Sequence, residues 1–164
     1  MSTPSSAIPA TLGNRLKGLV SALAILMALL GYFEGDKLTA YRDIGGVPTI
    51  CRGHTAGVHM GEVVTEEQCT TMDTTEAIAS LVVVDRAIPG TQPAKRRAAL
   101  ADFEYNVGSG AFLRSTVLRD IKAGDIRGGC DFLSKYVYVG DKIVPWQVKR
   151  RAIERELCLD GLDD

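Results

Sequence analysis

Two carboxylates and a hydroxyl near the start of the chain have the residue types and spacing of a hydrolytic site. Glu34 follows Tyr32 and Phe33 at the end of an uncharged stretch, and apolar surroundings favour the protonated form of a carboxylic acid, which can then donate its proton. Asp43 lies in a glycine-containing turn, where water keeps a carboxylate ionised, and Thr49 follows it on the next expected strand. Such a set is the equipment of a glycoside hydrolase, although Glu and Asp are too common for spacing alone to establish that activity.

A small sheet is expected to carry Asp43 and Thr49. Residues 38–58 contain short apolar runs separated by turn residues, which predicts an antiparallel hairpin or a three-stranded sheet. The residues from Thr65 to Gln68 form a capping-box pattern, which predicts a helix that starts near residue 66 and ends at Pro89-Gly90.

The rest of the chain is expected to be mostly helical. Further helices are predicted over residues 93–106, 115–122, 126–137, with Asp125 as N-cap, and 147–158. The positions expected to face inward on the helices are Ile78, Leu81, Val82, Ile88, Leu100, Phe103, Val148, Ile153 and Leu157. These elements predict an α+β fold, in which a small antiparallel sheet lobe and a mostly helical lobe have a cleft between them that suits an extended polymer.

The charges are balanced overall but unevenly distributed. The 164 residues include 19 Lys and Arg against 20 Asp and Glu, which fits one domain and argues against a nucleic-acid partner. Residues 1–33 contain no acidic residue, and their only charges are Arg15 and Lys17. The stretch from Gly18 to Phe33 is uncharged and rich in small residues, and as a helix it would reach ~24 Å, short of the ~30 Å hydrocarbon core of a membrane.

Three interpretations of this segment compete. It can be a cleaved signal peptide, although the residues after the apolar run form a poor cleavage site. It can be a buried helix of a cytosolic domain. The interpretation that we favour is a marginal membrane anchor over residues 1–33, which inserts and later leaves, followed by a catalytic domain over residues 34–164. Arg15 and Lys17 would then keep the N-terminus in the cytoplasm and place the body outside.

The chain has four cysteines, at positions 51, 69, 130 and 158, and none of them forms a C-x-x-C pair. Four cysteines allow three pairings, and we favour the two local pairs, Cys51–Cys69 and Cys130–Cys158, each of which would stabilise the fold by ~3 kcal/mol. The alternative is four free thiols in a cytosolic protein. His54 and His59 lack further residues at ligand spacing, so we expect neither a metal nor another cofactor.

The residues around Glu34, Asp43 and Thr49 closely resemble the catalytic signature of the phage-type lysozymes, glycoside hydrolase family 24. The resemblance covers about residues 32–159. It is carried by Phe33-Glu34-Gly35, Ala40-Tyr41-Arg42-Asp43, Gly46-Val47-Pro48-Thr49-Ile50, Gly53-His54-Thr55, Phe103-Glu104-Tyr105-Asn106-Val107-Gly108, Ser115-Thr116-Val117-Leu118, Ala123-Gly124-Asp125-Ile126 and the helix that contains Arg150-Arg151.

The resemblance implies a muramidase that cleaves the β-1,4 bond between N-acetylmuramic acid and N-acetylglucosamine in the glycan strands of peptidoglycan. It implies that Glu34 is the general acid, that Asp43 stabilises positive charge or orients the attacking water, and that Thr49 places that water. It also implies that Tyr41, Asn106 and Arg150 contact substrate. His54 matches a family histidine that is mostly structural and held by a carboxylate.

The leader and the four cysteines resemble those of signal-anchor-release endolysins of lambdoid phages. This resemblance implies export by the Sec machinery, an inactive form held as a single-pass protein at the host inner membrane, and release to the periplasm as a monomer that lyses the host cell. The chain departs from relatives at Arg52 and at Trp146-Gln147, and it has Asp43 where some relatives have a cysteine. A catalytically inactive peptidoglycan-binding module is the alternative from another functional class.

Overall fold

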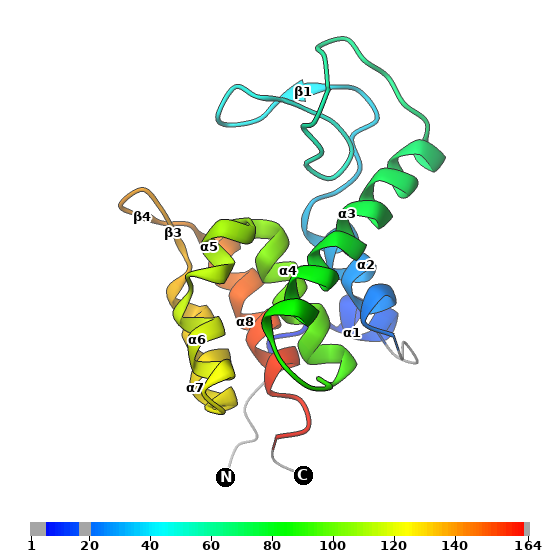
Figure 1. Ribbon diagram of the computed structural model, residues 1–164. Coiled ribbons are helices and arrows are strands. Elements are labelled where there is room, and N and C mark those ends of the chain that lie inside the picture. The colour runs from blue at the N-terminus through cyan, green and yellow to red at the C-terminus, as the bar shows by residue number, and fades with distance from the viewer. Residues whose placement is uncertain (1–5, 17–20, 163–164) are drawn as a thin grey trace.

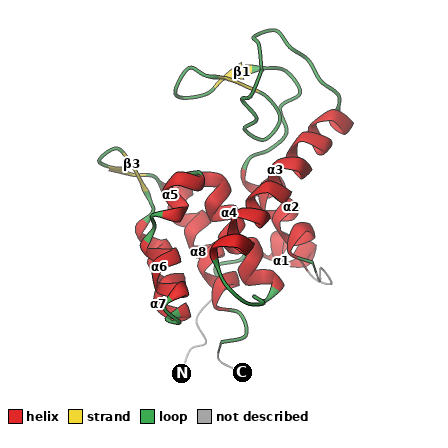
Figure 2. Cartoon of the chain, viewed as in Figure 1, coloured by secondary structure: helices red, strands yellow, loops and turns green. Residues whose placement is uncertain are grey.

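The computed structural model describes residues 6–16 and 21–162, which form two lobes joined by the long helix α3 (Glu66–Ala87). The small lobe contains β1 (Tyr41–Arg42) and β2 (Pro48–Thr49), which pair antiparallel. The second lobe is helical, and Figures 1 and 2 show its helices grouped below the small lobe. Its elements are α1 (Ala10–Leu16), α2 (Ala22–Phe33), α4 (Ala94–Val107), α5 (Ser109–Leu113), α6 (Thr116–Lys122), α7 (Ile126–Phe132), a 3-10 turn (Leu133–Lys135), β3 (Tyr138–Val139), β4 (Lys142–Ile143) and α8 (Pro145–Leu159).

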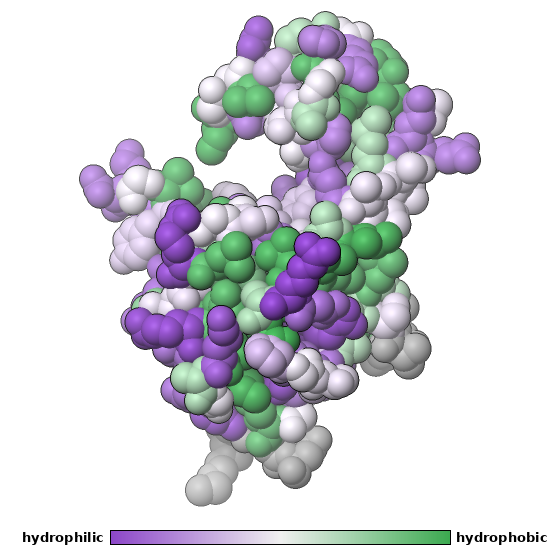
Figure 3. Space-filling model, in the orientation of Figure 1, coloured by the Kyte–Doolittle hydropathy of each residue, from purple (hydrophilic) through white to green (hydrophobic). Residues whose placement is uncertain are grey.

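This arrangement confirms the predicted α+β fold with a small sheet lobe and a mostly helical lobe. The space-filling view shows the surface hollowed between the small lobe and the helical lobe, on the side of the β3–β4 hairpin (Figure 3). The capping box at the start of α3 is confirmed, because the Thr65 hydroxyl accepts from the backbone N–H of Gln68 and the Gln68 side chain accepts from the backbone N–H of Thr65. The predicted N-cap at Asp125 is also present.

The uncharged N-terminal segment forms α2, which lies in the core of the helical lobe. Ser21 caps the helix by accepting a hydrogen bond from the Ala24 backbone N–H at 3.2 Å. The buried residues of α2 belong to the main apolar core, together with residues of α3 and α4; they are Ala22, Ile25, Leu26, Leu29 and Leu30. Lys17 and Gly18, at the predicted start of the apolar stretch, lie outside the described residues. Within the described part of the chain, no helix has the length and apolar character needed to cross a membrane.

Both predicted disulfides are present. Cys51–Cys69 ties the small lobe to the start of α3 and lies in a separate small apolar core, which also contains Ala40, Ile50, Val58 and Val64. Cys130–Cys158 joins α7 to α8 in the main core. Each lobe therefore has one covalent cross-link at its centre.

Some predicted core positions were wrong. Ile78 and Val82 are 46% and 38% exposed, because the face of α3 that packs inward carries Ala77, Leu81 and Val84 instead. Val148 is 44% exposed on α8, whereas the other predicted core residues of α8 are buried. The helix predicted over residues 126–137 ends at Phe132 and continues as a 3-10 turn. The sequence analysis did not predict α5 or the β3–β4 hairpin.

Candidate active site

Glu34 lies where α2 ends. Its backbone N–H donates to the Leu30 carbonyl at 2.9 Å, and its side chain, 25% exposed, accepts a hydrogen bond from Nη1 of Arg150 at 2.5 Å. The guanidinium of Arg150 also lies 4.9 Å from the ring centroid of Phe33. The expectation that Glu34 is held against an apolar surface is therefore incomplete, because its nearest charged neighbour is a cation.

Arg150 is held rigidly behind Glu34. Its Nε and Nη2 atoms donate to the two carboxylate oxygens of Asp102 at 3.0 and 2.9 Å, and both side chains are fully buried. Burial alone would lower the pKa of Arg150, but the charges of Asp102, Glu154 and Glu34 outweigh burial and raise its pKa above the ordinary value. Full burial leaves no exposed surface on Arg150 for the predicted contact with substrate.

A second arginine extends this buried network along α8. Arg151 donates to Glu154 through Nη1 at 2.5 Å and to the amide oxygen of Asn106 through Nη2. Burial raises the pKa of the Glu154 carboxyl well above its usual range, and the two neighbouring arginines oppose that rise only in part. Asn106 is half-buried on α4, and its amide oxygen is already engaged by Arg151.

Asp43 and Thr49 lie on either side of the turn between β1 and β2. One carboxylate oxygen of Asp43 accepts from the backbone N–H groups of Gly45 and Val47, each at 2.8 Å. Thr49 is buried, and its hydroxyl donates to the Val47 carbonyl at 2.9 Å. The turn needs a left-handed residue, which Gly46 provides with φ of 80°. The strand pairing thus fixes both predicted site residues in one short hairpin.

The hydroxyl of Tyr41 is affected by burial and by the charges of two carboxylates. Burial raises the pKa of its hydroxyl, and the negative charges of Glu34 and Asp43 raise it further. Nζ of Lys37 lies 4.8 Å from the ring centroid of Tyr41, so a cation covers part of the ring. The hairpin brings Tyr41, Asp43 and Thr49 together, because Tyr41 pairs with Thr49 across its two strands.

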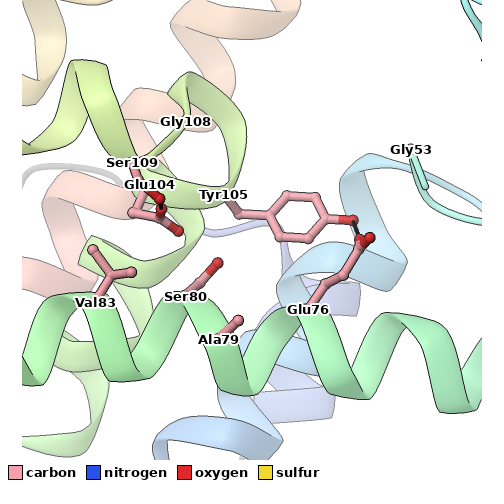
Figure 4. Close-up of a pocket in the computed structure, with 9 residues that line it drawn as sticks. All are labelled: Gly53, Glu76, Ala79, Ser80, Val83, Glu104, Tyr105, Gly108 and Ser109. Carbon is pink, nitrogen blue, oxygen red and sulfur yellow. Dashed lines mark hydrogen bonds between the residues drawn. The ribbon is translucent and has the colours of Figure 1, made fainter. Parts of the chain in front are cut away.

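His54 is held by a carboxylate, as its family resemblance implied. Its Nδ1 lies 2.5 Å from Oε1 of Glu76, and its Nε2 lies 3.1 Å from the Ala56 carbonyl. The hydroxyl of Tyr105 lies 2.7 Å from the Arg52 carbonyl oxygen and 3.1 Å from Oε2 of Glu76 (Figure 4). This network joins the small lobe to α3 and α4. Within residues 6–16 and 21–162, no three His, Cys, Asp or Glu side chains gather closely enough to hold a metal ion.

Similarity to known proteins identifies the family of this chain. A family model described as phage lysozyme matches residues 31–154, which include Glu34, Asp43, Thr49 and Arg150. The chain belongs to the phage lysozyme family. The resemblance found in the sequence is confirmed, and the enzyme is a lysozyme, a hydrolase of glycosidic bonds.

Two relatives and two solved structures show the extent of the similarity. The chain is 39% identical to the SAR-endolysin of bacteriophage PS119 over 129 residues, which cover 78% of this chain and 77% of the relative. It is 35% identical to the SAR-endolysin of enterobacteria phage P21 over 156 residues, 94% of each chain. The active form of the P1 phage endolysin Lyz has the same fold, with a TM-score of 0.75 and 21% identity over 96% of this chain and 98% of that one. The secreted inactive form of Lyz is less similar in fold, with a TM-score of 0.51 over 65% of this chain and 76% of that one.

Sequence reasoning missed Asp102 and Glu154, the buried carboxylates that hold the two arginines. Asp102 interrupts an apolar run from Ala98 to Phe103, and an acidic residue inside such a run indicates a buried partner. Glu154 lies four residues after Arg150 on α8, a spacing that places both on one face of the helix. These two signals could have found the network.

Proposed function

We propose that this lysozyme is a phage endolysin that lyses the host cell by hydrolysing the β-1,4 bond between N-acetylmuramic acid and N-acetylglucosamine in peptidoglycan. The observation that carries this proposal is the carboxylate of Glu34, which the buried Arg150 holds at 2.5 Å where α2 ends. Glu34 has a fixed cationic partner, and the second carboxylate, Asp43, is held by backbone N–H groups. Two carboxylates in different environments are what glycoside hydrolysis uses.

In this mechanism Glu34 donates its proton to the glycosidic oxygen as the bond to the anomeric carbon breaks. Arg150 stabilises the carboxylate that remains, because its charge is fixed 2.5 Å away. Asp43 stabilises the positive charge on the sugar ring, orients the attacking water and accepts the proton that the water loses as it bonds to the anomeric carbon. Exchange with solvent then returns a proton to Glu34 and removes the one on Asp43. The Thr49 proton is committed to the Val47 carbonyl, so the lone pairs of the hydroxyl are left to accept a hydrogen bond from that water.

We propose that Tyr41 and Asn106 contact the substrate, each for a different reason. Tyr41 is half-buried beside both carboxylates and can lie against a sugar ring. Asn106 keeps its amide nitrogen for a ligand, since its oxygen accepts from Arg151. Arg150 is better described as a positioning residue, because its side chain is fully buried and acts through Glu34.

Product analysis tests which bond is cleaved. Purified peptidoglycan is digested with the full chain, and the new reducing ends are reduced with borohydride and identified by mass spectrometry. The proposal predicts reduced N-acetylmuramic acid. Reduced N-acetylglucosamine would indicate a glucosaminidase, and a digest without new reducing ends would support the inactive binding module.

We also propose that residues 1–33 are a temporary anchor and residues 34–164 the catalytic domain. The precursor is exported by the Sec machinery, spans the host inner membrane once with its body outside, and is released to the periplasm as a monomer. Helix α2 supports this idea because its 12 uncharged residues rise only ~18 Å, which makes insertion in a ~30 Å core marginal. Its leucines have a second apolar environment to enter, since Leu26, Leu29 and Leu30 pack in the core after release.

The position of Glu34 explains why an anchored chain would be inactive. Glu34 directly follows α2, so a membrane that holds α2 keeps this carboxylate away from Arg150. The burial of α2 also argues against a signal peptide cleaved near Glu34, because cleavage would remove Leu12 and the five buried residues of α2 from the core.

Fractionation of cells before and after treatment with an ionophore tests anchoring and release together. Wild type is expected in the membrane before treatment and in the periplasm afterwards. Replacing Ala24 and Ala28 by Leu increases apolar character at half-buried positions and should retain the protein in the membrane, whereas Ala24→Ser with Ala28→Ser should hasten release. Equal release of both variants would contradict an escaping anchor, and an N-terminus near Glu34 would establish a cleaved signal.

A further inference from the structure

A pocket of about 300 Å³ opens between α3 and the junction of α4 and α5, beside Tyr105. Figure 4 shows its lining, with Glu76, Ala79, Ser80 and Val83 along α3 facing residues of α4 and α5. Tyr105 belongs to this lining. Burial raises the pKa of its hydroxyl, and the negative charges of Glu76, Asp73 and Glu34 raise it further. Glu34 itself is not among the residues that line the pocket.

Two side chains in the pocket have oxygen atoms that accept no hydrogen bond from the described residues. The Glu104 side chain is only 4% exposed and accepts one hydrogen bond, from the Ser109 hydroxyl at 2.5 Å; no cation pairs with it among the described residues. Ser80 is 5% exposed, and its hydroxyl, which Figure 4 shows directed into the pocket, makes no hydrogen bond within the described part of the chain. Neither oxygen is among the fully enclosed atoms without a partner, so a molecule in the pocket can reach both and donate hydrogen bonds to them.

The charged and apolar residues of the lining favour one kind of ligand. It contains two carboxylates, Glu76 and Glu104, and neither lysine nor arginine, so an anion is repelled and a cation attracted. Glu76 is already engaged by His54 and Tyr105, which leaves Glu104 for a ligand. An ammonium has three donors and no acceptor, and it matches the free acceptors of Glu104 and Ser80. Ala79 and Val83 provide an apolar wall for methylene groups.

We propose that this pocket binds the ammonium-bearing aliphatic side chain of a diamino acid in the peptide attached to the glycan strand. The inference rests on the proposed function, because it makes the stem peptide of peptidoglycan part of the recognised substrate. Glu104 and Ser80 accept hydrogen bonds from the ammonium, and its alkyl chain lies along Ala79 and Val83. The glycan then reaches Glu34 while the peptide is held beside Tyr105.

Kinetics with Glu104→Gln test this role. The substitution keeps the size of the side chain and its ability to accept from Ser109 but removes the charge. On peptidoglycan with free amines, KM should rise about tenfold with little change in kcat, as expected for the loss of a hydrogen bond to a charged group. On peptidoglycan whose amines have been acetylated, wild type and Glu104→Gln should have the same KM. Asp141→Asn, which removes an exposed charge from the turn between β3 and β4, serves as the matched control and should match wild type on both substrates.

Direct binding separates this inference from the proposed catalytic function. The full chain with Glu34→Gln is titrated with Nα-acetyl-lysine amide, and amide shifts of Ser80 and Ser109 are followed by NMR. Saturable shifts with this probe, their absence with Nα,Nε-diacetyl-lysine amide and their loss in Glu104→Gln support the pocket. Equal KM changes on both substrates, or equal shifts with both probes, would overturn the inference and leave the muramidase proposal intact.

Discussion

The carboxylate of Glu34 lies 2.5 Å from Nη1 of Arg150, although the two residues are 116 positions apart in the chain. Glu34 ends α2, and Arg150 lies in α8, so this contact joins the apolar N-terminal segment to the C-terminal helix. Because Asp102 holds Arg150 through two further hydrogen bonds, the position of the proposed acid depends on three helices. The candidate site is therefore complete only when α2 is packed in the helical lobe.

The first prediction concerns the geometry around Arg150. Arg150→Lys keeps the positive charge but cannot hold Asp102 through two bonds and Glu34 through a third. We expect kcat to fall by about tenfold or more and the free energy of unfolding to fall by about 3 kcal/mol, as for a broken buried ion pair. Hydrolysis rates and urea denaturation measure both effects. Arg155→Lys, in the exposed pair with Asp131, is the matched control and should change neither.

A second prediction separates the charge of Asp43 from its role in the turn. Asp43→Asn keeps an oxygen that can accept from Gly45 and Val47, so the melting temperature should not change, while the hydrolysis rate should fall by about 100-fold. Asp43→Ala removes the turn hydrogen bonds as well and should lower both the rate and the melting temperature. Full activity of Asp43→Asn would exclude an electrostatic role for this carboxylate.

A third prediction follows from Asp73 on α3. Its side chain is buried, neither carboxylate oxygen accepts a hydrogen bond, and Nε of Arg52 lies 3.5 Å away. Burial raises the pKa of Asp73 above the ordinary value of 3.8, although the charge of Arg52 opposes this rise. The folded state therefore binds this proton more tightly than the unfolded state, and the stability gained from it is present below pH 3.8 and lost as pH rises through the folded pKa.

Asp73→Asn cannot lose that proton, so its melting temperature should rise relative to wild type as the pH increases from 3.5 to 7. Thermal denaturation across this range measures the difference, with Asp141→Asn as a surface control. A difference that stays constant with pH would show that the Asp73 pKa is the same in the folded and unfolded states.

The fourth prediction compares the two disulfides. Replacing either pair by serines should cost about 3 kcal/mol of stability, according to the chain-entropy model. Loss of Cys51–Cys69 should also reduce activity at temperatures where the protein remains folded, because Cys51 precedes Arg52 and His54 in the network that joins the lobes. Loss of Cys130–Cys158, between α7 and α8, should lower the melting temperature with a smaller effect on activity. Equal losses of activity would remove the distinction between the two cross-links.

The local signals in the sequence predicted much of the fold. The capping box at Thr65, the cap at Asp125 and the two local cysteine pairs all occur as expected. The β3–β4 hairpin was missed even though its two-residue turn, Gly140-Asp141, joins short β-forming segments, which is a recognised hairpin signal. Ile78 and Val82 were placed on the wrong face because α3 spans two lobes and packs on different neighbours along its length.

The parts that sequence could not predict depend on contacts between distant residues. An uncharged stretch such as α2 has the same composition whether it packs in a core or lies in lipid, so composition could not show that Leu26 and Leu30 are core residues here. The spacing from Arg150 to Glu154 is a local signal of a charge pair, but full burial of Arg150 depends also on Asp102, which comes 48 residues earlier. Periodicity identifies faces of helices, but it does not identify which buried charges meet.

Substitution of Glu34 by Gln tests whether Glu34 is the catalytic acid. The variant keeps the size of the side chain and should fold, which circular dichroism can verify, but glutamine cannot donate the proton that the glycosidic oxygen requires. The measurement is the rate at which the released full-length chain clears a suspension of permeabilised Gram-negative cells. We expect this rate to fall at least about 1,000-fold relative to wild type. Clearing at the wild-type rate by Glu34→Gln would contradict the assignment of Glu34 as the catalytic acid.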